Sequence, residues 1–222
     1  MPARGRGHGG GGEEPPARGP RAHAHAGSMR QGENSVEQVS EAGRVGGPRP
    51  AASSGSGTQA NDLVTSSTGR PGGTPDGHPT RIQTDDDAAT TRSIEMENSG
   101  AVTLANQGWQ VKQNPTPREV AQARQETGDT GNPDSNPDYL VEGRVFDAFS
   151  PTKPTKSVRN IWTEIEDKVV ERRQTQRAVI NLEDWRGDMS ALRKQFADWP
   201  IPGLKEVKAI TPDGDIVQID LP

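Results

Sequence analysis

The chain has 222 residues, of which 28% are hydrophobic and 4% are aromatic, and its formal net charge is −5. So few apolar residues exclude a single globule of this length and indicate a folded part joined to an unfolded part. The acidic balance excludes a generally basic nucleic-acid-binding surface, and the absence of cysteine excludes disulfides and thiolate metal sites.

The first 92 residues are rich in Gly, Pro, Ser, Thr and Arg, and all eight aromatic residues (four Trp, one Tyr and three Phe) lie at or beyond Trp109. Scattered apolar side chains could not offset the backbone entropy of about 1 to 2 kcal/mol per ordered residue. We therefore predict a disordered arm or linker over residues 1–92 and a folded domain over residues 93–222. The sequence shows no signal peptide and no run long enough to span a bilayer.

The folded part begins with a helix and a short strand. Apolar residues recur at helical spacing over 94–107, and Ser93 is placed to cap the start. Residues 109–113 alternate between apolar and polar side chains, as in a strand. Residues 114–136, rich in Pro, Gly, Asp and Asn, predict a surface excursion with at most a short helix near 118–126.

The segment PDYLVEGRVFDAF, residues 137–149, has the composition of a β-hairpin with Glu142 and Gly143 as its turn. Pairing outward from that turn places Asp138 opposite Asp147. At an effective dielectric constant near 20, two such charges about 5 Å apart repel by roughly 3 to 4 kcal/mol. A fold tolerates the pair if one carboxyl is protonated, if water screens both at an exposed edge, or if a cation lies between them; a shifted register would separate them.

The remaining elements alternate between helix and strand. We expect an amphipathic helix over 155–173, a buried strand over 178–182, a helix capped by Asp188, and strands over 207–210 and 216–219. This order predicts an α/β domain with a mixed sheet flanked by helices.

Four further side chains are candidates for a site built around the two aspartates. Glu97 on the first helix is the best placed third carboxylate, and Lys168 lies at the margin of an apolar helical stripe. Arg159 and Arg172 share that helix and could contact a phosphate backbone. For each of the four, the alternative is an ordinary solvated surface position.

Five segments in this order resemble the C-terminal tRNA nuclease domain of contact-dependent growth inhibition toxins of the CdiA type. The likeness covers about residues 94–222, and five ordered segments are more specific than any single motif. The segments are ENSGAVTLANQGWQVKQNP (97–115), PDYLVEGRVFDAFSPT (137–152), RNIWTEIEDKV (159–169), AVINL (178–182) and LRKQFADWPIPGLKEV (192–207).

The resemblance implies a restriction-endonuclease-like (PD-(D/E)XK-related) α/β fold and assigns roles to the candidate residues. Glu97, Asp138 and Asp147 would be catalytic and would hold a divalent metal ion, Mg or Zn. Lys168 would stabilise the negative charge that develops during phosphodiester cleavage, and Gln113 would contact the substrate or support the site.

The resemblance also implies a function. We expect a secreted or delivered ribonuclease toxin, monomeric, that cleaves tRNA in the cytoplasm of a target bacterium and is neutralised by a cognate immunity protein. Alternatives are a DNA-cleaving toxin on the same fold and a non-enzymatic binding module. Three features depart from the family pattern. The insertion at 116–136 is long, SNPDY (135–139) replaces a more basic approach to the PD pair, and Ala148 and Phe149 follow Asp147 where a (D/E)xK motif would have its lysine.

Overall fold

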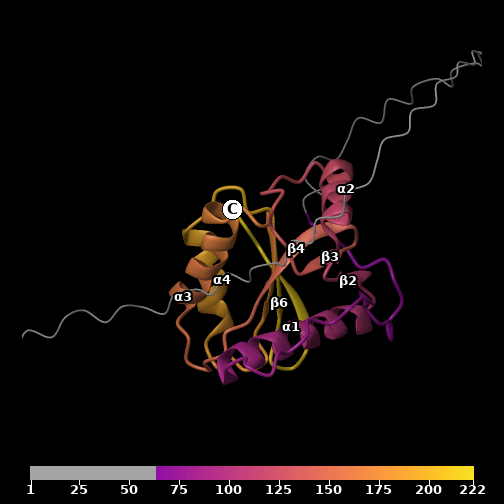
Figure 1. Ribbon diagram of the computed structural model, residues 1–222. Helices are drawn as coiled ribbons and strands as arrows, with labels where there is room; N and C mark the ends of the chain where they lie inside the picture. The colour runs from indigo at the N-terminus through magenta and orange to yellow at the C-terminus, as the bar shows by residue number, and fades with distance from the viewer. Residues whose placement is uncertain (1–63) are drawn as a thin grey trace, which may run out of the picture. The chain divides into compact units, whose positions relative to one another are not determined.

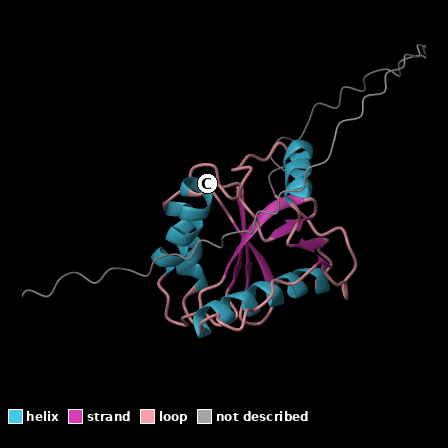
Figure 2. Cartoon of the chain, in the orientation of Figure 1, coloured by secondary structure: helices cyan, strands magenta, loops and turns pink. Residues whose placement is uncertain are grey.

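A computed structural model describes residues 64–222, and within them the chain forms one mixed β-sheet with helices on both faces (Figures 1 and 2). The strands are β1 (Asp76–Gly77), β2 (Val111–Gln113), β3 (Tyr139–Val141), β4 (Arg144–Phe149), β5 (Arg177–Asn181), β6 (Glu206–Ile210) and β7 (Ile216–Ile219). The helices are α1 (Ala88–Asn106), α2 (Pro117–Thr127), α3 (Val158–Glu166), the π-helical turn η1 (Asp167–Glu171) and α4 (Met189–Asp198). The α/β class with a mixed, helix-flanked sheet is thus confirmed.

The seven strands lie side by side in the order of the sequence. β1 and β2 are parallel, β2–β3 and β3–β4 are antiparallel, β4, β5 and β6 are parallel, and β7 returns antiparallel to β6. The helices α1, α3 and α4 supply the connections that parallel strands require. Because β4 pairs with a strand on each side, it lies in the interior of the sheet.

Each face of the sheet has its own apolar core. On one face, α3 and α4 pack on β5 and β6 through buried residues that include Ile161, Ile165 and Phe196. On the other face, α1 covers β2 to β4 through Ala101 and Leu104. In Figure 1, α1 runs below the strands, and α3 and α4 lie to their left. None of the helices in the described part of the chain is long and apolar enough to cross a membrane.

The first helix starts six residues earlier than its apolar pattern predicts. Asp87, rather than Ser93, caps α1 by accepting a hydrogen bond from the Thr90 N–H at 2.7 Å. The prediction followed apolar periodicity, which begins only where the helix reaches the sheet. Ser93 instead lies inside α1.

The excursion between β2 and β3 contains a full helix, α2, longer than the short one expected. Thr116 and Glu119 form a reciprocal capping box at its start, and Gly128 ends it in the left-handed conformation at φ 69°. Residues Val120 and Ala123 pack against Val145 of β4. The capping residues outweigh a composition that otherwise indicated a loop.

The predicted boundary of the arm is wrong for residues 64–92, which belong to the folded unit. The Thr65 N–H and hydroxyl both donate to Glu206 Oε1, at 3.0 and 2.8 Å, and β1 extends the sheet beside β2. This segment is held by polar side-chain and backbone hydrogen bonds. Its low content of apolar residues therefore gave no sign that it belongs to the folded unit. Residues 1–63 of the predicted arm lie outside the described residues.

The hairpin has the predicted register. Tyr139 pairs with Phe146 and Val141 with Arg144, while Glu142 and Gly143 adopt positive φ angles of 50° and 72°. Two consecutive positive φ angles suit a two-residue hairpin turn, because they match the twist of the strands. The next pair outward is Asp138 and Asp147. The alternatives of a shifted register and an exposed edge are therefore wrong.

Candidate active site

A polar cavity of about 290 Å³ opens between α1, the end of β4 and the α3–η1 helix. Four of the residues predicted for the site line it, namely Glu97, Asp138, Lys168 and Arg172. The complete lining is Ser93, Glu97, Asp138, Ala148, Phe149, Ser150, Glu164, Lys168 and Arg172. The cavity therefore brings together residues that are up to 79 positions apart in the sequence (93 to 172).

Asp138 lines this cavity and lies close enough to Asp147 for the two side chains to hydrogen-bond to each other. Asp138 is half-buried and opens onto the cavity, and its Oδ2 accepts a hydrogen bond from the Ala148 N–H at 2.7 Å. Asp147 lies behind it with only 1% of its side chain exposed, and its Oδ2 accepts a hydrogen bond from Lys168 Nζ at 3.0 Å. The Asp147 Oδ1 atom is buried and is without a well-aligned hydrogen-bond partner within residues 64–222.

The two carboxyl groups have pKa values shifted in opposite directions. Burial raises the pKa of Asp138 well above its ordinary value, and the negative charges of Asp147 and Glu97 raise it further. Burial alone would also raise the pKa of Asp147, but the charge of Lys168 and hydrogen bonds from Asp138 and Lys168 outweigh it and lower that pKa. These opposite shifts favour a proton on Asp138 over one on Asp147, and a shared proton is one of the ways to tolerate such a pair.

Lys168 reaches the aspartates from η1, where the helix widens to a π-helical turn. Burial lowers the pKa of Lys168, but the charges of Asp147 and Asp138 outweigh burial and leave that pKa raised. The lysine is therefore a cation at neutral pH. Isolated π turns recur at functional sites, where they displace a side chain from regular helical spacing.

Glu97 is held at the cavity wall by a segment that the sequence assigned to the arm. The Thr80 hydroxyl donates a short hydrogen bond to Glu97 Oε1. Asn98 fixes Thr80 by accepting from its N–H at 2.8 Å and donating to its carbonyl oxygen at 2.9 Å. The hydroxyl of buried Tyr139 donates to the Glu97 carbonyl oxygen, which ties α1 to the hairpin.

The other predicted contacts have different positions. Gln113 is buried and does not line the cavity. Its Nε2 donates to Asn98 Oδ1 at 3.0 Å, so it helps to hold the Asn98 side chain that binds Thr80. Arg172 lines the cavity and pairs with Asp167 at 2.6 Å. Arg159 is not among the residues that line the cavity, because its guanidinium stacks 4.2 and 4.7 Å from the ring centroids of Trp162 and Trp199. The structure thus does not bring it to the predicted site.

Sequence reasoning missed Thr80, Ser150 and Glu164. Glu164 lies one helical turn before Lys168, and this spacing on an amphipathic helix could have indicated a shared face. Its carboxylate Oε1 pairs with Lys156 Nζ at 2.8 Å. No comparable signal marks Thr80, since only the fold places it beside Glu97.

Three comparisons with known proteins bear on the site. Residues 135–216 match the family model of the contact-dependent growth inhibition CdiA C-terminal domain. A curated relative, the "tRNA nuclease CdiA-2" of Burkholderia pseudomallei, is 41% identical over 143 residues, which are 64% of this chain and 4% of the relative. The chain therefore corresponds to a small part of that protein. A solved CdiA-CT/CdiI toxin and immunity complex, also from Burkholderia pseudomallei, contains a chain that is 38% identical. It aligns with a TM-score of 0.55 over 67% of this chain and 99% of its own length.

Proposed function

The chain belongs to the contact-dependent growth inhibition CdiA C-terminal domain family, and from this we propose that it is a toxin that cleaves tRNA phosphodiester bonds in a target bacterium. The relative named as a tRNA nuclease and the toxin solved with its immunity protein support this proposal. By the same likeness, a cognate immunity protein neutralises the chain in the producing cell, and the toxin acts in the cytoplasm of the target.

The observation that carries the proposal is the contact of Asp138 with buried Asp147 beside Lys168, at a polar cavity that Asp138 and Lys168 line. Two aspartates forced together cost stability, and a structural role would be served as well by apolar side chains of similar size. Groups with opposed pKa shifts in a cleft are typical of a catalytic site.

The finer fold assignment, to the restriction-endonuclease-like group, is part of this proposal. Supporting it are the mixed sheet, a hairpin that carries both aspartates, and a glutamate on the helix before them. The lysine differs in origin, since Lys168 comes from η1 and not from the strand after Asp147.

A divalent metal ion is also part of the proposal, and the donor set suits magnesium better than zinc. Among residues 64–222, no group of three or more His, Cys, Asp or Glu side chains is arranged to hold a metal ion. Mg²⁺ needs no such cage, because it binds through one or two carboxylates together with water and substrate phosphate. Asp138 and Asp147 would hold the ion together with water and substrate phosphate, and Glu97 lines the same cavity as Asp138. A bound divalent ion supplies Lewis acidity that polarises a phosphate and activates water.

The chain's own residues perform the remaining tasks. The Lys168 ammonium group stabilises the negative charge that develops on the phosphate, and it remains protonated because its pKa is raised. Arg172, at the cavity wall, binds a phosphate oxygen in exchange for its exposed pair with Asp167. Thr80 orients the Glu97 carboxylate toward the cavity.

The decisive variant is Asp138→Asn in the full chain. Asparagine keeps the shape and the hydrogen bond from the Ala148 N–H, so we expect native circular dichroism with at least a 100-fold loss of tRNA cleavage, of the order seen when catalytic groups are removed. The measurement incubates purified protein with tRNA and, separately, with plasmid DNA, each with and without EDTA. The Arg118→Gln variant, changed on exposed α2, is the matched control.

Several results would contradict the proposal. A folded Asp138→Asn protein that cuts tRNA at the wild-type rate would remove the aspartates from the mechanism. Cleavage of plasmid but not of tRNA would change the substrate to DNA. If expression of the chain in a sensitive bacterium caused no growth defect and left total RNA intact, the chain would be a binding module. Unimpaired cleavage of tRNA in EDTA would contradict the metal ion but not the rest of the proposal.

A further inference from the structure

The loop at residues 150–157 carries two lysines directly from the cavity wall to the protein surface. It begins at Ser150, which lines the cavity together with Phe149, and the N–H of Lys156 closes a turn on the Lys153 carbonyl oxygen at 3.0 Å. Because the loop leaves the end of β4, its position is fixed relative to the aspartates.

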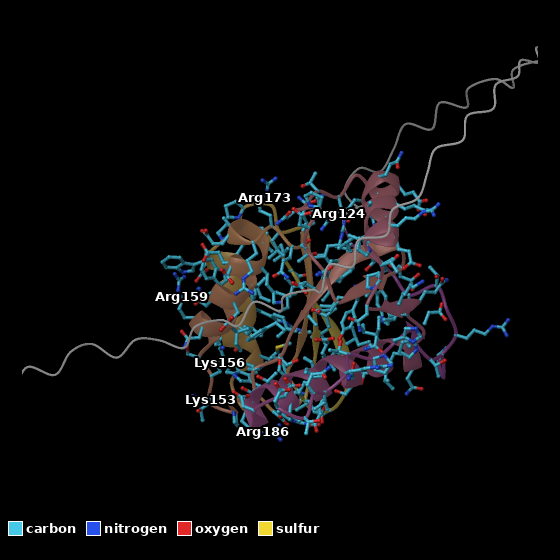
Figure 3. The ribbon with its side chains drawn as sticks, viewed as in Figure 1. Arg124, Lys153, Lys156, Arg159, Arg173 and Arg186 are labelled. Carbon is cyan, nitrogen blue, oxygen red and sulfur yellow. The ribbon has the colours of Figure 1, made fainter. Side chains whose placement is uncertain are left out.

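A second segment docks on this loop and adds a third cation. The Arg186 N–H donates to the Pro154 carbonyl oxygen at 2.9 Å, and Trp185 Nε1 donates to the Lys156 carbonyl oxygen at 2.7 Å. Trp185 is buried, which anchors both segments to the core. Lys153, Lys156 and Arg186 therefore lie on one well-anchored surface, and Figure 3 shows them following one another along the edge below α3.

Within residues 64–222, two of these cations have no acidic partner, and Arg186 Nη1 donates only to the backbone carbonyl oxygens of Glu183 and Trp185, at 2.9 and 3.4 Å. Lys153 and Arg186 are exposed and have no carboxylate oxygen within 4.0 Å in the described part of the chain. The acidic residues next to Arg186 are occupied, since Arg92 pairs with Asp184 at 2.7 Å and with Glu183 at 3.7 Å.

Lys156 links this surface to the cavity. Its ammonium lies 5.0 Å from the ring centroid of Phe149 and pairs with Glu164, and both partners line the cavity. The Glu164 side chain is 43% exposed. Pairs this exposed contribute about 0 to 1 kcal/mol, so a phosphate group can take the place of the carboxylate.

The chemistry of an RNA strand requires such a surface. The chain has a net charge of −5, and the cavity contains acidic groups, so phosphates on either side of the cleaved bond need local positive charge. Phosphate contacts of this kind position a nucleic acid without reading its sequence.

We propose that Lys153, Lys156 and Arg186 form a basic rim that binds the phosphate backbone of the RNA strand next to the cavity. The basic rim rests on the proposed function, since it positions the substrate of that site. It touches no reacting atom, so it governs binding of tRNA and the KM and leaves kcat unchanged.

The test measures tRNA binding as a function of salt. The parent is the full chain with Asp138→Asn, and the variant adds Lys153→Gln and Arg186→Gln, both exposed positions. Fluorescence anisotropy with labelled unfractionated tRNA gives the affinity between about 50 and 200 mM KCl. Each lost phosphate contact reduces the slope of log K against log salt by about 0.7 to 0.9 and weakens binding about fivefold in ~0.1 M salt. We therefore expect the double change to reduce the slope by about 1.5.

The controls separate the basic rim from the proposed function. Arg118→Gln, on exposed α2, must leave the slope of the parent unchanged. If the parent binds tRNA and the double variant has the same slope, the basic rim is wrong while the proposed function stands. Absence of tRNA binding by the parent overturns both. A fall in kcat at unchanged KM in the Lys153→Gln, Arg186→Gln protein with Asp138 restored would also contradict the rim.

Discussion

Asp138 and Asp147 have pKa values shifted in opposite directions although they occupy opposite positions of one hairpin. Only Asp147 contacts the Lys168 ammonium, whereas Asp138 receives a backbone N–H and lies beside two other carboxylates. These surroundings favour the protonated form of Asp138, and a proton there reduces the repulsion between the two carboxyl groups as a cation between them would. Loss of that proton and binding of a divalent ion are thus linked in the proposed mechanism.

The stability of the protein should depend on the charge of Asp138. Its pKa is raised in the folded state, so its stabilising contribution is complete below the ordinary value of 3.8 and is lost as pH rises through the folded pKa. The Asp138→Asn variant cannot ionise at this position, so it does not lose this stability as pH rises. In urea titrations at increasing pH with EDTA present, the variant should gain stability relative to wild type as pH rises. A difference that stays constant with pH would contradict the assignment of the proton.

Asp147→Asn should have the opposite effect, because it leaves Lys168 without its carboxylate in a site where the lysine is only 17% exposed. Breaking one side of a buried ion pair costs about 3 to 5 kcal/mol. Since the pKa of Asp147 is lowered, the stability that it contributes is present above 3.8 and is lost as pH falls through its folded pKa. Chemical denaturation at neutral pH measures the cost, and adding Lys168→Met should recover part of it.

At the scale of elements, the site depends on a clamp between α1 and the segment before it. Asn98 holds both backbone groups of Thr80, and Asn114 Nδ2 donates to the His78 carbonyl oxygen at 2.7 Å. The clamp brings the Thr80 hydroxyl to Glu97, so a stretch without apolar periodicity becomes part of the cavity wall.

Asn98→Ala should release this clamp. The substitution removes three hydrogen bonds of the Asn98 side chain, each of which contributes about 0.5 to 1.5 kcal/mol. Because water can replace some of them once the segment relaxes, we expect the free energy of unfolding to fall by about 1 to 3 kcal/mol in total. Hydrogen exchange should accelerate at the Thr80 amide while α3 and α4 remain protected. Gln122→Ala, which removes an exposed pair with Glu126 on α2, is the control and should change stability by less than about 0.5 kcal/mol.

At the scale of the whole molecule, a buried network of charges joins segments from both ends of the described chain. Arg177 pairs with Glu206 at 2.7 Å and with Asp129 at 3.1 Å, and Lys208 pairs with Glu206 at 2.7 Å. Thr65 closes the network by donating twice to Glu206. All of these side chains are almost completely buried, so each needs its partners in the network to offset the cost of removing its polar group from water.

Glu206→Gln should destabilise the whole unit. The substitution leaves Lys208 without its carboxylate partner and weakens the anchor of residue 65, so a loss of about 3 to 5 kcal/mol is expected by analogy with other buried ion pairs. Urea denaturation followed by tryptophan fluorescence measures it. Glu183→Gln, changed at an exposed ion pair, should stay within about 0.5 kcal/mol of wild type, and an equal loss in both variants would contradict a special role for the network.

The sequence by itself determined the order of elements from α1 to β7, the hairpin and its register, because these follow from local periodicity and turn chemistry. It placed Asp138 opposite Asp147 for the same reason: the two residues are joined by nine positions of one hairpin. It also carried the family resemblance, which the comparisons confirmed.

Only the tertiary structure decided which partner each carboxylate has. Three separate segments bring Lys168, Glu97 and Thr80 to the aspartates. The pKa of Asp138 depends on burial and on the charged residues among these neighbours. Arg159 shares a helix with Lys168, yet it stacks on tryptophans away from the cavity. Residues 64–92 joined the fold through hydrogen bonds to distant strands. Local periodicity and turn residues predict the order of helices and strands. The protonation, burial and polar contacts of a side chain depend on distant segments that only folding brings together.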